Sequence, residues 1–167
     1  METLGPPGTH YLSAAIGWME LGNLTEAKAE LAKVDPGLLK HPNVLEVSWA
    51  IHASDQNWSQ ALQAAQQLVE FASDRASGWL HRAYALRRAP GGGLQPAWDA
   101  LLPAVDRFPH EATIPYNLAC YACQLGQLDE ARRWLQRALA VGEKAKIKRM
   151  ASADSDLQPL WKEVKNW

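Results

Sequence analysis

The sequence lacks several features that would assign it to familiar classes of protein. No apolar run reaches the roughly 18 residues that a membrane-spanning helix requires. The first residues lack the basic start and apolar stretch of a secretory signal. Only 2 cysteines occur among 167 residues, and the 5 histidines show no metal-ligand spacing to one another. We therefore expect no membrane span, no secretion signal, no bound metal and no cofactor.

Catalytic motifs and strong net charge are also missing. Gly91–Gly93 is not followed by the Lys and Ser/Thr of a phosphate-binding loop. No Ser/His/Asp arrangement and no paired acidic motif is found, so we expect no enzyme. The formal net charge is −1, and the basic cluster between Arg132 and Arg149 is interpreted as a solvated helix face. We therefore expect no nucleic acid among the partners.

The sequence does contain a repeat of small residues. Ala27, Ala61, Ala97 and Ala131 recur at spacings of 34, 36 and 34 residues, each three residues after a large apolar residue. A constant period near 34 indicates an array of helical repeats. Further apolar residues lie four and seven positions after each alanine, which places them on one helix face. The alanines are predicted to lie where two helices pack closely.

Each repeat has a polar turn before its alanine helix. The turns are centred on Gly22, Gln56, Gly91–Gly93 and Gly126. After them, Thr25, Ser59 and Asp129 are predicted to cap the second helix of their repeats, and Thr9 is predicted to cap the first helix of the chain. The two extra residues of the third repeat fall in its glycine-rich turn, where an insertion changes the loop entropy little.

These repeats resemble the tetratricopeptide repeat (TPR), and the similarity is strongest in Tyr116–Tyr121 and Leu125–Ala131. The resemblance implies an all-α solenoid, a right-handed superhelix whose concave groove faces a partner protein. Four repeats are predicted at 8–41, 42–75, 76–111 and 112–145, within an array spanning 9–153. Residues 1–8 are predicted to be a flexible lead-in. The resemblance to small bacterial TPR proteins further implies a cytoplasmic scaffold.

The second repeat fits the TPR pattern least well. Trp49 stands where TPR proteins prefer Gly or Ala, and Gln56 replaces the turn glycine. Tryptophan is abundant in the chain as a whole, with 8 residues. Trp18, Trp58, Trp98 and Trp134 are interpreted as bulk between helices, since large rings fill such spaces well.

Residues 154–167 are predicted to form a C-terminal capping helix. Leu157, Leu160, Trp161 and Val164 form an i, i+3, i+4, i+7 apolar stripe, and charged residues occupy the opposite face. Such a polar-backed cap covers the last apolar edge of a solenoid and keeps it soluble.

The resemblance also locates the groove, because the first helix of each TPR lines the concave side. The predicted partner-binding residues are Leu12, Ile16, Met19, Glu46, Ala50, Leu80, Tyr84, Arg87, Arg88, Tyr116, Cys120 and Cys123. Leu12 and Ile16 stand where TPR proteins that grip a C-terminal carboxylate need polar residues, so a different ligand is expected. We predict a peptide or helix with apolar anchors. The alternative is that the N-terminal arm or a second copy of the chain covers this stripe.

Three functions remain open. The first is a non-catalytic adaptor, monomeric or weakly self-associating, that binds a partner protein or peptide. The second is a homo-oligomerising structural module or a secretion-type chaperone. The third is a thiol or metal enzyme that uses the Cys120-x-x-Cys123 pair. The pair is predicted to lie in mid-helix, where Cys acts as a small apolar filler. A structural zinc site needs four ligands, and the pair supplies only two.

Overall fold

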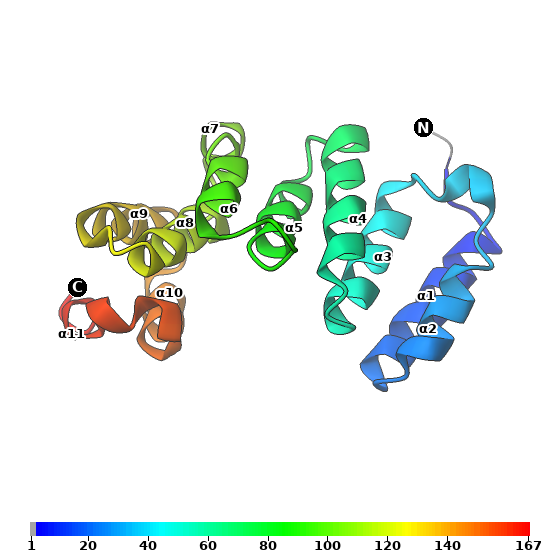
Figure 1. The fold of residues 1–167 in the computed structure, drawn as a ribbon, viewed down its shortest axis with the longest axis horizontal. Helices are drawn as coiled ribbons and strands as arrows, with labels where there is room; N and C mark the ends of the chain where they lie inside the picture. Colours follow the sequence, from blue (N-terminus) through cyan, green and yellow to red (C-terminus); the bar gives the residue numbers. More distant parts are fainter. Residues whose placement is uncertain (1–2) are drawn as a thin grey trace. The chain divides into compact units, whose positions relative to one another are not determined.

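A computed structural model describes residues 3–167, and the regular elements in that range are all helices (Figure 1). The all-α class predicted from the sequence is therefore confirmed. The chain divides into two compact units, which we call unit 1 (up to Gly91) and unit 2 (Gly92–Trp167). None of the described helices is both long and apolar enough to cross a bilayer.

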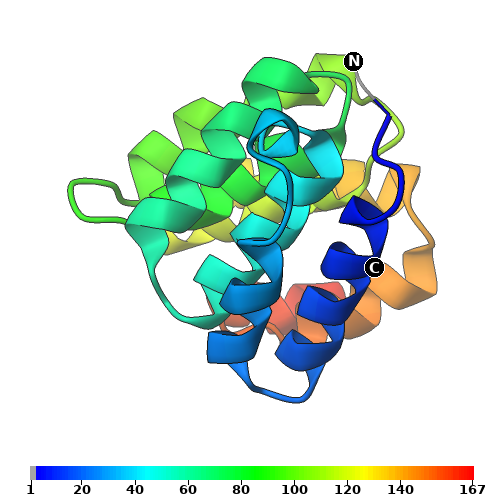
Figure 2. The same cartoon turned by 90° about the vertical axis from the view of Figure 1, so that its right-hand side faces the viewer.

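Unit 1 is a succession of helices in which neighbours along the chain pack together. Its elements are α1 (Gly8–Glu20), α2 (Leu24–Leu31), the 3-10 helix η1 (Pro36–Leu38), α3 (Pro42–Ser54), α4 (Trp58–Phe71) and α5 (Ala76–Leu86). α1 packs on α2, α3 on α4, and α4 on α5. Figure 2 shows the tight turn that joins α1 to α2. α1, α3 and α5 begin at the residues near which the first three repeats were placed, while the domain boundaries themselves stay a prediction.

Unit 2 contains the remaining helices. They are α6 (Leu94–Leu101), α7 (Ala104–Arg107), α8 (Thr113–Gln124), α9 (Leu128–Val141), α10 (Lys144–Ala153), the 3-10 helix η2 (Ser155–Leu160) and α11 (Trp161–Val164). α8 packs mainly on α9 and also on α6 and η2. The segment predicted as the third repeat, 76–111, thus contributes α5 to unit 1 and α6 with α7 to unit 2.

The repeated alanines lie at the centre of the packing. Ala27, Ala61, Ala97 and Ala131 are all fully buried, and so are Leu101 and Leu135 four residues after the last two. A larger side chain has no space at these positions, which explains the selection of alanine in every second helix. The prediction that these residues form the seam between helices is confirmed.

The turns differ from the prediction by a small shift in register. α2 and α4 begin one residue after Asn23 and Asn57, whose side chains accept hydrogen bonds from the Glu26 and Gln60 amides at 3.2 and 3.3 Å. Thr25 and Ser59 therefore lie inside the first turn, and their predicted capping role is wrong. Asparagine is as good a cap as serine or threonine, so the sequence offered two candidates at each turn.

Two other predicted caps are also wrong. Thr9 lies inside α1, which begins at Gly8 after Pro7. Asp129 lies inside α9, which begins at Leu128. Gln56 has φ +54°, in the left-handed region that Gly22 and Gly126 occupy in the equivalent turns. The second repeat thus forms the same turn with a residue that is less suited to it.

The tryptophans are less buried than predicted. Trp18 is exposed, and Trp58, Trp98 and Trp134 are half-buried. Trp98 and Trp134 still contact each other edge to face, with ring centroids 5.9 Å apart. The interior of the repeats is instead made mainly of Ala, Leu, Ile and Val, together with Tyr116, Tyr121 and the two cysteines.

Residues 154–167 are helical, but they do not form one α-helix. Asp154 caps η2 by accepting a hydrogen bond from the Asp156 amide, and a short α-helix begins only at Trp161. Pro159 lies inside η2 and has no N–H with which to close an α-helical hydrogen bond. Leu157, Leu160 and Val164 are nevertheless fully buried, so the predicted apolar stripe is the packed side of the segment.

Candidate protein-binding faces

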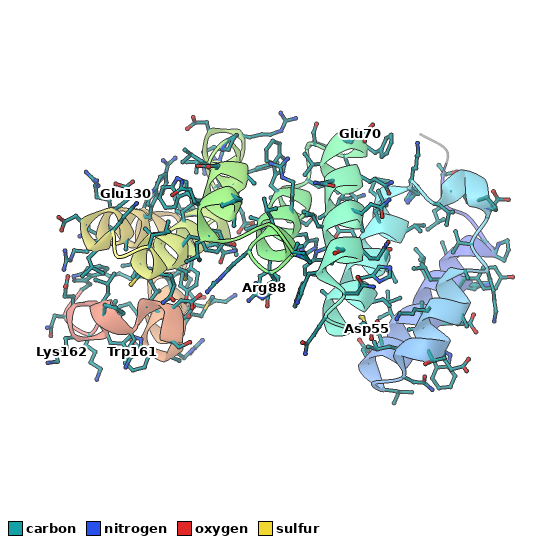
Figure 3. All side chains as sticks on the ribbon, in the orientation of Figure 1. Asp55, Glu70, Arg88, Glu130, Trp161 and Lys162 are labelled. Carbon is teal, nitrogen blue, oxygen red and sulfur yellow. The ribbon has the colours of Figure 1, made fainter. Side chains whose placement is uncertain are left out.

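The predicted groove residues of unit 1 lie on α1, α3 and α5, and only some of them are accessible. Leu12 is buried in the core and Met19 packs against that core. Glu46, Ala50, Leu80 and Arg87 are half-buried, whereas Ile16 and Tyr84 are 38% and 39% exposed. Arg88, just beyond α5, is also exposed (Figure 3). The accessible part of this stripe is therefore concentrated at Ile16 and at the end of α5.

Five side chains form a cluster around Tyr84, which we call the Tyr84 cluster: Trp49, Trp58, His81, Tyr84 and Arg88. The Trp49 and His81 rings are stacked, with centroids 3.6 Å apart and planes 11° apart. Tyr84 meets Trp49 edge-on at 6.2 Å and Trp58 at 5.8 Å. Such ring pairs stabilise beyond their buried area. The cluster joins α3, α4 and α5.

Arg88 lies flat against this cluster. Its guanidinium carbon is 3.6 Å from the centroid of the Tyr84 ring and 5.3 Å from that of Trp58. One guanidinium nitrogen donates a hydrogen bond of 3.0 Å to the Tyr84 carbonyl oxygen. A cation near the C-terminal end of a helix is also favoured by the helix dipole. These contacts hold an exposed positive charge in a fixed orientation.

Glu46 links α3 to α5 beneath the cluster. The Ser77 hydroxyl donates to Glu46 Oε1, and His81 Nε2 lies 2.9 Å from Glu46 Oε2. Burial by itself raises the pKa of Glu46, but the hydrogen bonds from His81 and Ser77 outweigh it and leave the pKa below its ordinary value. Glu46 is therefore charged at neutral pH and already has its partners within unit 1.

The predicted groove residues of unit 2 do not form an open surface. Tyr116, Cys120 and Cys123 are only 4–5% exposed because η2 packs on α8. The Tyr116 hydroxyl donates to Asp154 Oδ2 at 2.9 Å, and Cys120 Sγ lies 3.6 Å from the same oxygen. The expectation that these three residues line an accessible groove is thus corrected. The cover is the chain's own C-terminal segment rather than its N-terminal arm.

Further contacts hold this segment in place. Gln124 Nε2 donates to the Asp156 carbonyl at 3.0 Å, and Trp161 Nε1 donates to the Asp154 carbonyl at 3.0 Å. Arg132 forms two hydrogen bonds of 2.8 Å with the Glu163 carboxylate, and these hold the pKa of Glu163 below its ordinary value. Trp161 is half-buried in this segment, whereas the next residue, Lys162, is exposed (Figure 3).

The environment of Cys123 does not favour nucleophilic chemistry. Burial, together with nearby Asp156, raises the pKa of Cys123, whereas a reactive cysteine needs a lowered pKa. Cys120, Asp154 and Asp156 present three potential ligand atoms within 4.8 Å of one another. This grouping was not predicted from the sequence, where Asp154 and Asp156 stand out only as the start of the C-terminal cap. The Asp154 carboxylate already receives hydrogen bonds from Tyr116 and the Asp156 amide.

Known structures share this fold. No protein-family model and no curated protein matches the chain. TTC0263, a thermophilic TPR protein of Thermus thermophilus, superposes with a TM-score of 0.68 at 20% identity, over 93% of this chain and 81% of that one. A MamA protein gives 0.72 at 16% identity, over 95% and 86%. A MamA RS-1 double mutant gives 0.68 at 18%, over 92% and 80%. The chain therefore has the helical-repeat fold of a TPR protein.

Proposed function

We propose that the chain is a non-catalytic adaptor that binds a peptide or helix of a partner protein on the α1, α3 and α5 face of unit 1. The observation that carries the proposal is the exposed, ordered Tyr84–Arg88 pair at the end of α5. Tyr, Trp and Arg are the residue types that most often anchor protein interfaces. Their rigid stacking also lowers the conformational entropy that a partner would otherwise remove on binding.

Two features of unit 1 favour a protein ligand over a small molecule. The accessible predicted residues come from separate helices, Ile16 from α1 and Tyr84 from α5, and the residue predicted on α3, Ala50, is small and half-buried. An extended segment or helix can contact such separate anchors at once. The equivalent face of α8 is covered, so we assign partner binding to unit 1.

Site-specific crosslinking tests this assignment. We would replace Tyr84 with the photoreactive residue benzoylphenylalanine, illuminate the protein in an extract of the cells that make it, and identify the crosslinked chains by mass spectrometry. The matched control carries the same residue at Gln66, which is exposed on α4. We expect a discrete crosslinked partner from position 84 and none from position 66.

Other outcomes would decide against the proposal. Crosslinks from position 84 only to a second copy of the chain, with a dimer in light scattering, would favour the homo-oligomerising alternative. Equal crosslinking from positions 84 and 66 would indicate that the face has no special role.

A further inference from the structure

The faces of α5 and α8 are equivalent in sequence register, and among residues 3–167 only the α8 face is covered by another segment. Counting from the predicted repeat starts at residues 76 and 112, Tyr84 corresponds to Cys120 and Arg88 corresponds to Gln124, an offset of 36 residues. The covered α8 face therefore shows, within the same molecule, what kind of segment such a face can bind.

The segment bound on α8 is acidic at its start and apolar afterwards. Asp154 places its carboxylate against Tyr116 and Cys120, and the Asp156 carbonyl accepts from Gln124. Leu157 and Leu160 then bury their side chains completely. The polar contacts fix the register of the segment, and the leucines remove apolar area from water.

The α5 face carries a stronger donor at the position equivalent to Gln124. Within the described part of the chain, the contacts of Arg88 are those to the Tyr84 carbonyl and to the rings of Tyr84 and Trp58. Glu46, the carboxylate that contacts His81 of the cluster, already has Ser77 and His81 as its partners. Among residues 3–167, the charge of Arg88 is therefore not balanced by an ion pair.

We propose that the Tyr84 cluster binds an acidic segment of the partner protein, in which an Asp or Glu carboxylate pairs with Arg88 and an adjacent aliphatic side chain packs on Tyr84. This inference rests on the proposed function and names the chemistry of its partner. A guanidinium offers a fork of N–H donors that matches a carboxylate. Its stacking on Tyr84 already fixes the plane of that fork.

A peptide titration tests the charge requirement directly. The probe is a fluorescein-labelled peptide with the sequence of residues 153–161, added to the full chain and followed by fluorescence anisotropy. A second peptide carries Asn in place of both aspartates. Loss of a charge-assisted hydrogen bond is expected to weaken binding by about tenfold or more, so the Asn peptide should bind at least that much more weakly at low salt.

Variants of the protein identify the site. Arg88→Gln should weaken binding of the acidic peptide about tenfold, again the loss of one charged pair, and Arg88→Lys should recover part of it. The matched control is Arg137→Gln, because Arg137 is an exposed arginine 5.6 Å above the Trp134 ring in unit 2. This control should bind like the wild type, and all three variants should melt like it.

The remaining outcomes separate this inference from the proposed function. Peptide binding that is unchanged by Arg88→Gln would mean exchange with the segment on α8, and it would overturn the inference. Absence of binding, or equal binding of the Asn peptide, would overturn it as well. If position 84 still crosslinks to a partner whose crosslinked segment has no acidic residue, the proposed function stands and the acidic-segment inference fails.

Discussion

The first-helix faces of α5 and α8 occupy equivalent positions in successive repeats, yet they have opposite environments. On α5 the aromatic residue, Tyr84, is exposed and supports an arginine. On α8, Tyr116 is buried, and its hydroxyl donates a hydrogen bond to Asp154 in the chain's own C-terminal segment. The same repeat geometry can thus present a surface or bind a segment.

The largest expected effect comes from removing the cover of α8. Deleting residues 154–167 removes the buried side chains Leu157, Leu160 and Val164, each contributing about 1.5–3 kcal/mol. That sum approaches the whole stability of an ordinary domain. The truncated chain should aggregate or show a much lower melting temperature in calorimetry. A matched deletion of 165–167, which leaves all three in place, should melt close to the full chain.

An unchanged melting temperature after the long deletion would show that the segment contributes little to unit 2. The α8 face would then have to be regarded as accessible, like the α5 face, and the contrast between the two faces would not hold.

A smaller effect should separate the two tyrosines. Burial above all, together with Cys120 and Asp154, raises the pKa of the Tyr116 hydroxyl, which therefore stays protonated and donates to Asp154. Tyr116→Phe leaves that carboxylate without the donor and should lower the free energy of unfolding by about 1–3 kcal/mol. Tyr84→Phe keeps the ring that supports Arg88 and should change stability by less than about 0.5 kcal/mol.

Urea unfolding of the two variants measures this difference. Equal decreases in the free energy of unfolding would show that the exposed Tyr84 hydroxyl has a structural role. A neutral Tyr116→Phe would mean that the contact with Asp154 does not help to hold the cover.

The sequence predicted the parts of this comparison that depend on local pattern. The alanine spacing identified the buried seam at Ala61 and Ala131, and the TPR resemblance placed Tyr84 and Tyr116 on first-helix faces. The caps of α2 and α4 were misassigned because an asparagine and a hydroxyl residue lie two positions apart at each of these turns, as with Asn57 and Ser59, whereas α1 and α9 begin without a side-chain cap. A short pattern could not decide between them.

The cover of α8 could not be predicted because it depends on contacts between distant positions. Asp154 meets Tyr116 and Cys120 across 38 and 34 residues, and a single sequence does not show such pairs. Trp49 was a partial indication, in the sequence, of the Tyr84 cluster. Trp49 stands where TPR proteins prefer a small residue, and in the structure it stacks on His81. The unusual residue type therefore indicated the position of the cluster but not which residues Trp49 contacts.

The smallest expected effect concerns the hydrogen bonds that join α3 to α5 under the Tyr84 cluster. Because the folded-state pKa of Glu46 lies below its ordinary value, its contribution to stability is present above about pH 4.5 and is lost as the pH falls through the folded pKa. Glu46→Gln should therefore be less stable than the wild type at pH 7, and the difference should disappear on acidification. Other acid-sensitive groups, such as His52 with its lowered pKa, are common to both proteins and cancel in the comparison.

Glu70→Gln is the matched control, since Glu70 is an exposed carboxylate on α4 (Figure 3), and its stability curve should follow the wild type throughout. Urea unfolding at several pH values measures all three. A Glu46→Gln deficit that persists unchanged in acid would show that the residue acts through packing rather than charge, and the α3–α5 connection would then rest on the stacked Trp49 and His81 rings.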